Sequence, residues 1–174
     1  DKTVHFLLDG KEIDNKTSVA GASGLSDSYS IAAQDNGSHL FEVYMTANVG
    51  GKTIESNHIV KDIIWYDEAL GIPVIGCAQQ TFTARQYEAT NITFTVIDPS
   101  TETPNVTLVS SYVNEDGDTV EENRSELTMT GNTHTWQFKT SVIGKHTLSI
   151  ICGEVQKTLI GNIVDIGIEV SPIT

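Results

Sequence analysis

Histidines are the side chains in this sequence best suited to acid-base chemistry or metal binding, and the chain contains five: His5, His39, His58, His134 and His146. They are scattered, without an H-x-x-x-H pattern or the His-carboxylate spacing of metal sites. His39 and His146 each begin a similar alternating stretch shortly after a glycine. A histidine repeated at this position is most simply a cap on the turn and a cover for the core edge. The histidines therefore predict no metal site.

Two cysteines, Cys77 and Cys152, are too few for a disulfide framework and lack the C-x-x-C spacing of zinc or redox sites. Both end apolar strand patterns, which favours two buried thiols. A disulfide between them stays open as an alternative, because the sequence does not fix the distance between their Cα atoms.

One acidic loop, Asn114 to Asn123, superficially resembles an oxygen-rich calcium loop, because several carboxylates and Asn114 surround Gly117. An EF-hand loop has its glycine at the sixth position and a bidentate Glu at the twelfth, whereas the glycine here comes fourth. We therefore interpret this segment as a solvated hairpin tip.

The sequence contains no recognised catalytic motif. There is no G-x-S-x-G elbow, and no Ser or Cys stands in a known motif with a histidine and a carboxylate. Acidic pairs are unsurprising in a chain with 23 Asp and Glu residues, and none lies between aromatic residues as in a glycosidase cleft. The stretch from Gly21 to Ser28 lacks the strand-to-helix context of a phosphate loop. We expect no enzyme, with no catalytic residue and no cofactor.

Composition and charge exclude further classes of protein. The chain has 174 residues, of which 39% are hydrophobic, so it can build a core. Its net charge of -13 would repel phosphate backbones, and we expect no nucleic-acid partner. No apolar run approaches the ~18 residues needed to span a bilayer, so no membrane insertion is expected. The first residues lack the layout of a secretory signal, as expected for a mature or excised chain.

The elements that position these side chains form an internal repeat. Gly37 follows Tyr29 by eight positions, and Gly144 follows Trp136 by eight positions. Alternating residues then share one face of a strand in each copy: His39, Phe41, Val43 and Met45, and His146, Leu148, Ile150 and Cys152. Farther along, the expected matches are 51–54 with 156–159, and Asn57 with Asn162.

Each copy is preceded by a second hairpin. Residues 3–13 predict two strands around an Asp9-Gly10 turn, and residues 105–122 have the same layout. Helical periodicity is lacking, so helix content should be very low. With strands at 72–78 and 91–98, the second copy has about seven strands, as an immunoglobulin-like module has. We predict an all-β fold of two tandem immunoglobulin-like β-sandwich modules.

The two predicted modules are unequal. Residues 72–170 form a complete module, whereas residues 1–68 lack their N-terminal strands, with a boundary near 65–73. A sandwich without its first two strands would have an exposed edge and an uncovered face. Two explanations compete: the favoured one is that the chain is part of a longer one, and the other is that a partner donates the missing strand.

Exposed aromatic residues are candidates for binding sugars. Tyr29 and Trp136 occupy repeat positions where a sandwich places core aromatics. Trp65 and Tyr66, beside the boundary, are therefore the candidate surface contact, either as a sugar-stacking pair or as a contact between modules.

Stretches 36–57, 72–100 and 134–150 together resemble the tandem Ig-like modules of large structural proteins of tailed bacteriophages, particularly crAss-like phages of gut bacteria. The resemblance covers nearly the whole chain, through motifs that mark a fold. It implies a non-enzymatic decoration protein on the head or tail of a virion. Its partners would be other virion proteins in a multi-copy assembly, and host surface glycans. The alternative is an adhesin or glycan-binding module on a bacterial cell surface.

Overall fold

The computed structural model describes residues 2–18, 29–165 and 167. The chain divides into two compact units, residues 1–67 (unit 1) and residues 68–174 (unit 2). Strands dominate both, and the one helical element of the described chain is the short 3-10 turn η1 (Glu68–Leu70). The predicted all-β fold class is confirmed. No helix within the described ranges has the length and apolar character needed to cross a membrane.

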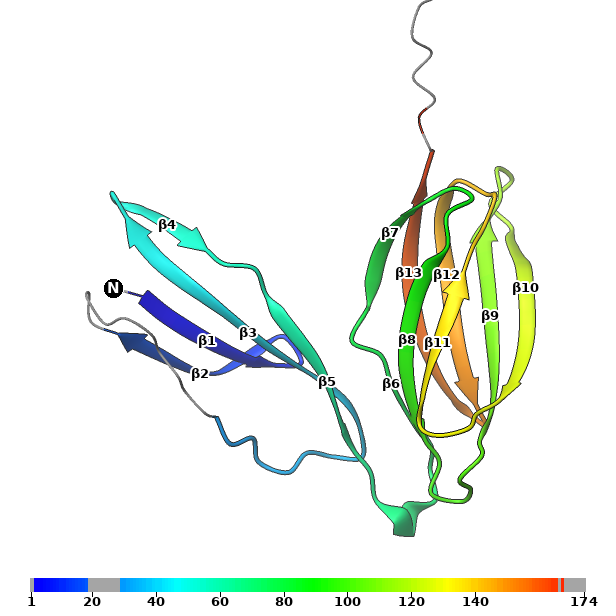
Figure 1. Ribbon diagram of the computed structural model, residues 1–174, viewed down its shortest axis with the longest axis horizontal. Coiled ribbons are helices and arrows are strands. Elements are labelled where there is room, and N and C mark those ends of the chain that lie inside the picture. Colours follow the sequence, from blue (N-terminus) through cyan, green and yellow to red (C-terminus); the bar gives the residue numbers. More distant parts are fainter. Residues whose placement is uncertain (1, 19–28, 166, 168–174) are drawn as a thin grey trace, which may run out of the picture. The chain divides into compact units, whose positions relative to one another are not determined.

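The described residues of unit 1 form five strands in one antiparallel sheet: β1 (Lys2–Leu8), β2 (Lys11–Ser18), β3 (Gly37–Val49), β4 (Lys52–Glu55) and β5 (Ile59–Trp65). The order is β2-β1-β3-β4, and β5 also pairs with β3 (Figure 1). The predicted turn between β1 and β2 is present, with positive φ at Asp9 (51°) and Gly10 (77°). Two positive φ angles match the right-handed twist of a tight hairpin.

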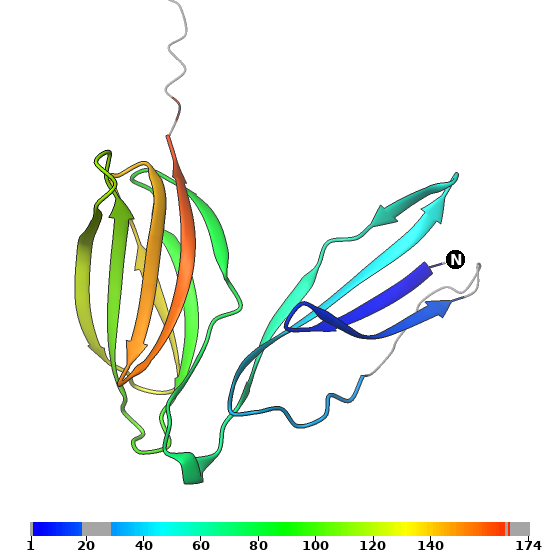
Figure 2. The same ribbon diagram turned by 180° about the vertical axis from the view of Figure 1, so that it is seen from behind.

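In unit 2 the part of the chain that the structure describes has eight strands: β6 (Val74–Gly76), β7 (Thr81–Arg85), β8 (Thr90–Ile97), β9 (Asn105–Val113), β10 (Thr119–Thr128), β11 (Thr133–Phe138), β12 (Gly144–Cys152) and β13 (Val155–Val164). They form a sheet in the order β10-β9-β12-β13-β7 and a second in the order β11-β8-β6. The two layers can be followed in Figure 1 and, from behind, in Figure 2. Unit 2 is thus an immunoglobulin-like sandwich.

The core of unit 2 lies between its two sheets. Ile92 and Phe94 of β8 belong to the same buried cluster as Leu148 and Ile150 of β12, and all four are at most 1% exposed. Both cysteines lie in this core as buried thiols, with Cys77 1% and Cys152 2% exposed. The structure thus has the two buried thiols that the strand pattern favours, without a disulfide. Burial, with a smaller effect of Asp98, raises the pKa of the Cys152 thiol.

The internal repeat corresponds to two sheets of similar strand order, one in each unit. In unit 1 His39 faces Ile63 across β3 and β5, and in unit 2 His146 faces Gly161 across β12 and β13. The neighbours also correspond, because β1 and β2 follow one another on β3 as β9 and β10 do on β12. Unit 1 is therefore the counterpart of the larger sheet of unit 2.

Two expectations from the sequence need correction. The expected matches on the return strand, 51–54 with 156–159 and Asn57 with Asn162, are wrong, because β3 has 13 residues whereas β12 has 9. The longer hairpin of unit 1 adds the tip that contains β4, and this shifts the return strand. Unit 2 also has a strand, β7, that the sequence reading omitted. The described residues of unit 1 therefore lack strands that match β6, β7, β8 and β11 of unit 2, where two missing strands were expected.

Candidate functional site

The most unusual surface of the described chain is one face of the unit 1 sheet, called here the open face. Strand pairing places Val43 of β3 beside Phe6 of β1 and Ile59 of β5. Alternation puts these further apolar residues on the same side: Val4, Leu8, Phe41, Met45, Ile54 and Ile63. Phe6 and Leu8 are buried, but Ile54 is 52% and Ile59 is 64% exposed.

Unit 2 shows what would normally cover such a face. At the repeat positions of Phe41 and Val43, Leu148 and Ile150 are 0% exposed, whereas the two unit 1 residues are only partly buried. Strand, face and pairing register are the same in both units. The difference is the second sheet, β11-β8-β6, which lies over β12 in unit 2. The exposure in unit 1 therefore follows from the lack of a second sheet among its described residues.

Unit 1 retains a remnant of this layer over β1. Tyr29 stacks on Phe6 with ring centroids 5.3 Å apart, and the Lys16 ammonium lies 5.9 Å from the centre of the same ring. Tyr29 holds the repeat position of Trp136, which is 8% exposed in the core of unit 2. The prediction that Trp136 is a core aromatic is confirmed, and Tyr29 performs the same task for one end of the open face.

The outer edge of β5 adjoins the open face. In unit 2 the corresponding strand β13 lies between β12 and β7, which runs parallel to it. Within the part of the chain that the structure describes, β5 is paired with β3 and no strand takes the place of β7. An unpaired edge offers N–H and C=O groups to another strand. Unit 1 thus combines an apolar face with a free edge.

The opposite face of unit 1 carries a ladder of aromatic rings. Tyr44 stacks on His5, with centroids 4.6 Å apart, and on His58, with centroids 4.3 Å apart. His5 Nδ1 donates to Glu12 at 2.6 Å, and the two ring nitrogens of His58 face Glu42 and Glu55. The sequence reading missed this ladder. The register of β1 on β3 places His5 beside Tyr44, and the pairing of β5 with β3 brings His58, the residue just before β5, to the same ring.

The carboxylates of this ladder shift the protonation of its histidines and acids. Hydrogen bonds to Glu42 and then Glu55 raise the pKa of His58. Hydrogen bonds from His5 and Asn15 lower the pKa of Glu12. Partial burial, together with the surrounding carboxylates, raises the pKa of Tyr44. The face is therefore held together by charged hydrogen bonds between neighbouring strands.

Three residues of this ladder have the connectivity of a catalytic triad. Thr46 Oγ1 lies 2.9 Å from His5 Nε2, and His5 Nδ1 lies 2.6 Å from Glu12 Oε2. A triad also needs backbone donors aimed at an oxyanion. Thr46 pairs with Thr3 on one side and with Glu55 on the other, so the sheet ladder occupies the backbone around it. The arrangement fits a polar network on a sheet surface.

The prediction that His39 and His146 cap a turn is confirmed. His39 Nε2 donates to the carbonyl of Asp35 at 3.0 Å, and His146 Nε2 donates to the carbonyl of Val142 at 2.9 Å. Both carbonyls lie four residues upstream. The other nitrogen faces an acid in each case, Asp9 at 2.8 Å from His39 and Glu122 at 3.6 Å from His146.

Trp65 and Tyr66, the candidate surface contact, have different environments. Trp65 is partly buried and packs edge-on against His39, with ring centroids 5.5 Å apart. Tyr66 is 47% exposed. The side chain of Tyr66 is thus available to a partner, whereas Trp65 lies at the edge of the open face because its strand neighbour Gly37 aligns it with that side.

Two further features carry no cluster of reactive groups. In the acidic loop, the Asn114 side-chain oxygen accepts a hydrogen bond from the Asp118 backbone at 2.8 Å, which closes the turn. A search of the described residues finds no group of three or more His, Cys, Asp or Glu that could hold a metal ion.

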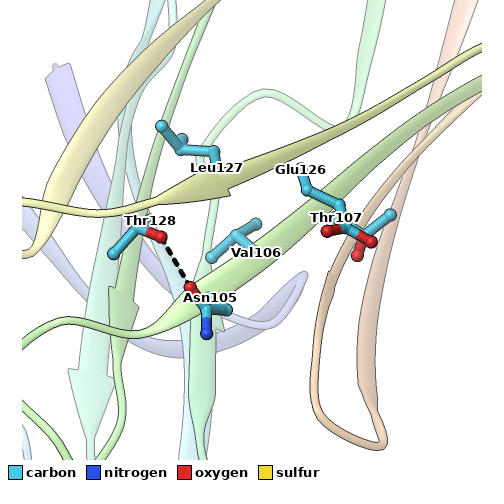
Figure 3. Close-up of a pocket in the computed structure, with 6 residues that line it drawn as sticks. All are labelled: Asn105, Val106, Thr107, Glu126, Leu127 and Thr128. Carbon is cyan, nitrogen blue, oxygen red and sulfur yellow. Dashed lines mark hydrogen bonds between the residues drawn. The ribbon is translucent and has the colours of Figure 1, made fainter.

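A shallow pocket between β9 and β10 is lined by Asn105, Val106, Thr107, Glu126, Leu127 and Thr128. There Thr128 donates to Asn105 at 2.7 Å (Figure 3).

Comparisons with known proteins find distant likenesses of fold. No family model matches, and no curated protein matches. The fibronectin(III)-like modules of Clostridium thermocellum CbhA are 16% identical, with 99% of this chain and 83% of that chain covered and a TM-score of 0.38. Domains 4 and 5 of the S-layer protein SbsC are 17% identical, with 74% and 58% covered and a TM-score of 0.38. A chimeric titin Z1Z2 is 16% identical, with 94% and 81% covered and a TM-score of 0.34.

Proposed function

We propose that this chain is a non-enzymatic structural module of a multi-copy surface assembly, and that the assembly is the virion of a tailed bacteriophage. There it decorates the head or tail and mediates assembly or attachment to the host surface. One observation supports an assembly role above all. The open face of unit 1 leaves Ile59 64% exposed, while the repeat counterparts of its β3 neighbours are fully buried in unit 2. A face of this kind is typical of an interaction surface.

The charge of the chain supports the same role. A net charge of -13 keeps many copies apart until a specific contact forms. The virion setting itself draws on the resemblance of the tandem modules to phage structural proteins. The bacterial adhesin receives less support, because one of its two candidate aromatics, Trp65, packs against His39 and leaves only Tyr66 well exposed.

The test is whether the chain is part of a particle. Phage particles would be purified on a density gradient from a sample that contains the gene for this chain. Peptides of this chain would be sought in the particles by mass spectrometry. The proposal predicts a fixed copy number relative to the major capsid protein across the particle band. Tight binding to glycans on a capsular polysaccharide array, with the chain absent from particles, would contradict it and favour the adhesin.

A further inference from the structure

We propose that unit 1 is completed in the assembly by a β-strand from a neighbouring polypeptide, which adds parallel to β5, has a small side chain opposite Ile63 and brings a carboxylate to Lys61. This inference rests on the proposed assembly role and specifies the partner of the open face.

Unit 2 supplies the template for the direction of the added strand. There β7 runs parallel to β13, with Phe82 aligned with Gly161 and Ala84 with Ile163. By the shared register of the two units, Gly161 corresponds to Ile63, since each faces the capping histidine. A strand that occupied the β7 position in unit 1 would therefore lie along residues 62–66 at the free edge of β5.

The side chain at the Phe82 position decides which strand fits. In unit 2 the Phe82 ring lies over Gly161, where an added Cβ would be 2.4 Å from the end of the ring. Unit 1 has Ile63 at this place, so the isoleucine occupies the space that glycine leaves open. A phenylalanine in the added strand would overlap it, whereas alanine or serine would pack against it. The strand that completes unit 1 is thus different from β7 itself.

Lys61 sets a second condition. It lies on the open face between Ile59 and Ile63, and it corresponds to Leu159, which is 0% exposed in unit 2. A lysine on the inward side of an edge strand discourages indiscriminate pairing. A covering strand would bury this charge and must therefore pair it. In unit 2 the residue at this level of the added strand is Gln80, whose carbonyl accepts from Ile160 at 3.0 Å.

The completing strand comes from outside the described chain. The core of unit 2 already uses the three strands of the required kind: Ile75 of β6, Ala84 of β7 and Phe94 of β8 are all buried there. Strand addition to an edge is a known mode of recognition, in which the backbone gives affinity and the alternate side chains give specificity. A neighbouring subunit in a multi-copy assembly can supply such a segment.

The probes are synthetic peptides of residues 72–98, with Cys77→Ser to prevent oxidation. The parent peptide keeps Phe82, the second has Phe82→Ala, and the third has Phe82→Ala with Gln80→Glu. Each would be titrated against the isotope-labelled full chain. Binding is followed by the indole N–H resonance of Trp65 and by amide exchange in β3 and β5.

Affinity should rise through this series. The Phe82→Ala peptide should bind at least about tenfold more tightly than the parent, because the overlap with Ile63 is removed. Gln80→Glu should add a further gain that weakens at high salt and disappears in the Lys61→Gln chain. In the Ile63→Ala chain the preference against Phe82 should shrink several-fold. Ile64→Ala, on the opposite face of the same strand, is the matched control and should leave the preference unchanged.

Several results would overturn the proposal. Equal binding of the parent and Phe82→Ala peptides to the unaltered chain would remove the small-residue condition, and this comparison needs no folded variant. If no peptide binds, but the same segment fused upstream of residue 1 protects the β5 amides, the completing strand belongs to the same polypeptide. Protection that appears on concentrating the chain alone would make a second copy the occupant. Absence of the chain from particles would contradict the virion proposal and leave the peptide result standing.

Discussion

Histidine protonation is the main electrostatic variable of unit 1. Both ring nitrogens of His58 face carboxylates, of Glu42 and Glu55, and those of His39 face the carboxylate of Asp9 and the carbonyl of Asp35. A neutral imidazole has one N–H, so only the imidazolium can donate in both directions. The charged form is therefore favoured at two places that join different strands.

The stability of unit 1 should fall as the pH rises above neutrality. Hydrogen bonds to carboxylates raise the pKa of His58 and His39 above 6.5. A histidine whose pKa is raised in the folded state stabilises that state, and this stabilisation is fully present below pH 6.5. It is lost as the pH rises through the raised pKa. Amide exchange in β3 and β5 at pH 6 and pH 9, after correction for intrinsic rates, measures the loss.

The control for this pH effect is the chain with both His39→Gln and His58→Gln. Its unit 1 should be less stable at pH 6 and nearly independent of pH between 6 and 9. On the acid side, the stability of unit 1 depends on Glu12, whose pKa is lowered from 4.5. The stabilisation by the Glu12 carboxylate is lost only as the pH falls through that lowered value. A unit 1 that gains stability from pH 6 to pH 9 would contradict the imidazolium assignment.

The triad-like contact of Thr46, His5 and Glu12 should be catalytically inert. The strand ladder uses the backbone around Thr46, which leaves no donor pair for an oxyanion. Hydrolysis of p-nitrophenyl acetate should therefore be equal, within about twofold, for the unaltered chain and for Thr46→Val. A His5→Gln chain controls for simple imidazole catalysis. A loss of about a hundredfold on Thr46→Val would show a nucleophile and overturn the non-enzymatic proposal.

At the scale of single residues, the sequence predicted roles that depend on local spacing. The histidine caps and the aromatic of the core edge repeat at fixed distances from Gly37 and Gly144. The ring ladder of His5, Tyr44 and His58 depends on pairing between distant strands, and no local pattern encodes that register. Sequence reasoning therefore found the caps and missed the ladder.

At the scale of strands, the close contact of β7 and β13 should be sensitive to one methyl group. Gly161→Ala places a Cβ 2.4 Å from the Phe82 ring, so the ring must move. We expect a loss of about 1–3 kcal/mol in the free energy of unfolding of unit 2. Urea unfolding followed by Trp136 fluorescence measures it.

The same contact can be checked by a double variant. Phe82→Leu in the Gly161→Ala chain should recover part of the loss, so that the two changes are not additive. Asn162→Ala, at an exposed neighbouring position, is the control and should change stability by no more than about 0.5 kcal/mol. Additive losses would show that the ring and the glycine do not share their space, and would weaken the small-residue condition at Ile63.

Strands bounded by turn signals were predictable, and a strand defined by a distant partner was not. The Asp9-Gly10 pair predicts the first hairpin because both residues accept positive φ angles. β7 has only five residues and pairs in parallel with the last strand of the unit. Its short alternation is too weak a signal without that partner. For this reason two strands were predicted ahead of β9, where the structure has three, β6, β7 and β8.

At the scale of the whole molecule, Lys61 should keep the open face from self-association. Lys61→Leu removes the one basic side chain between Ile59 and Ile63 and extends the apolar face. The added apolar area should lower the dissociation constant for self-association at least about tenfold, as sedimentation velocity over a concentration series would show. Lys145→Leu makes the same change of charge at an exposed site of unit 2, and should leave the sedimentation unchanged.

The plan of two repeated sheets was predictable because alternation and glycine spacing recur along the chain. The open face was foreseen in outline, since a sandwich without its first strands must leave one face uncovered. Its chemistry was not foreseen, because the position of Lys61 and the space at Ile63 emerge only when the two units are compared strand by strand.

Because both thiols are buried in unit 2, their labelling can measure how often the two sheets of that unit separate. Cys77 and Cys152 both belong to unit 2 and are at most 2% exposed, and burial raises the pKa of Cys152, so the native state resists alkylation twice over. A labelling reagent should modify Cys152 only when the sandwich separates. If reclosing is faster than labelling, the rate should report the free energy of that separation. Labelling that proceeds at the rate of a free thiol in the folded protein would show that the two sheets part far more readily than their packing implies.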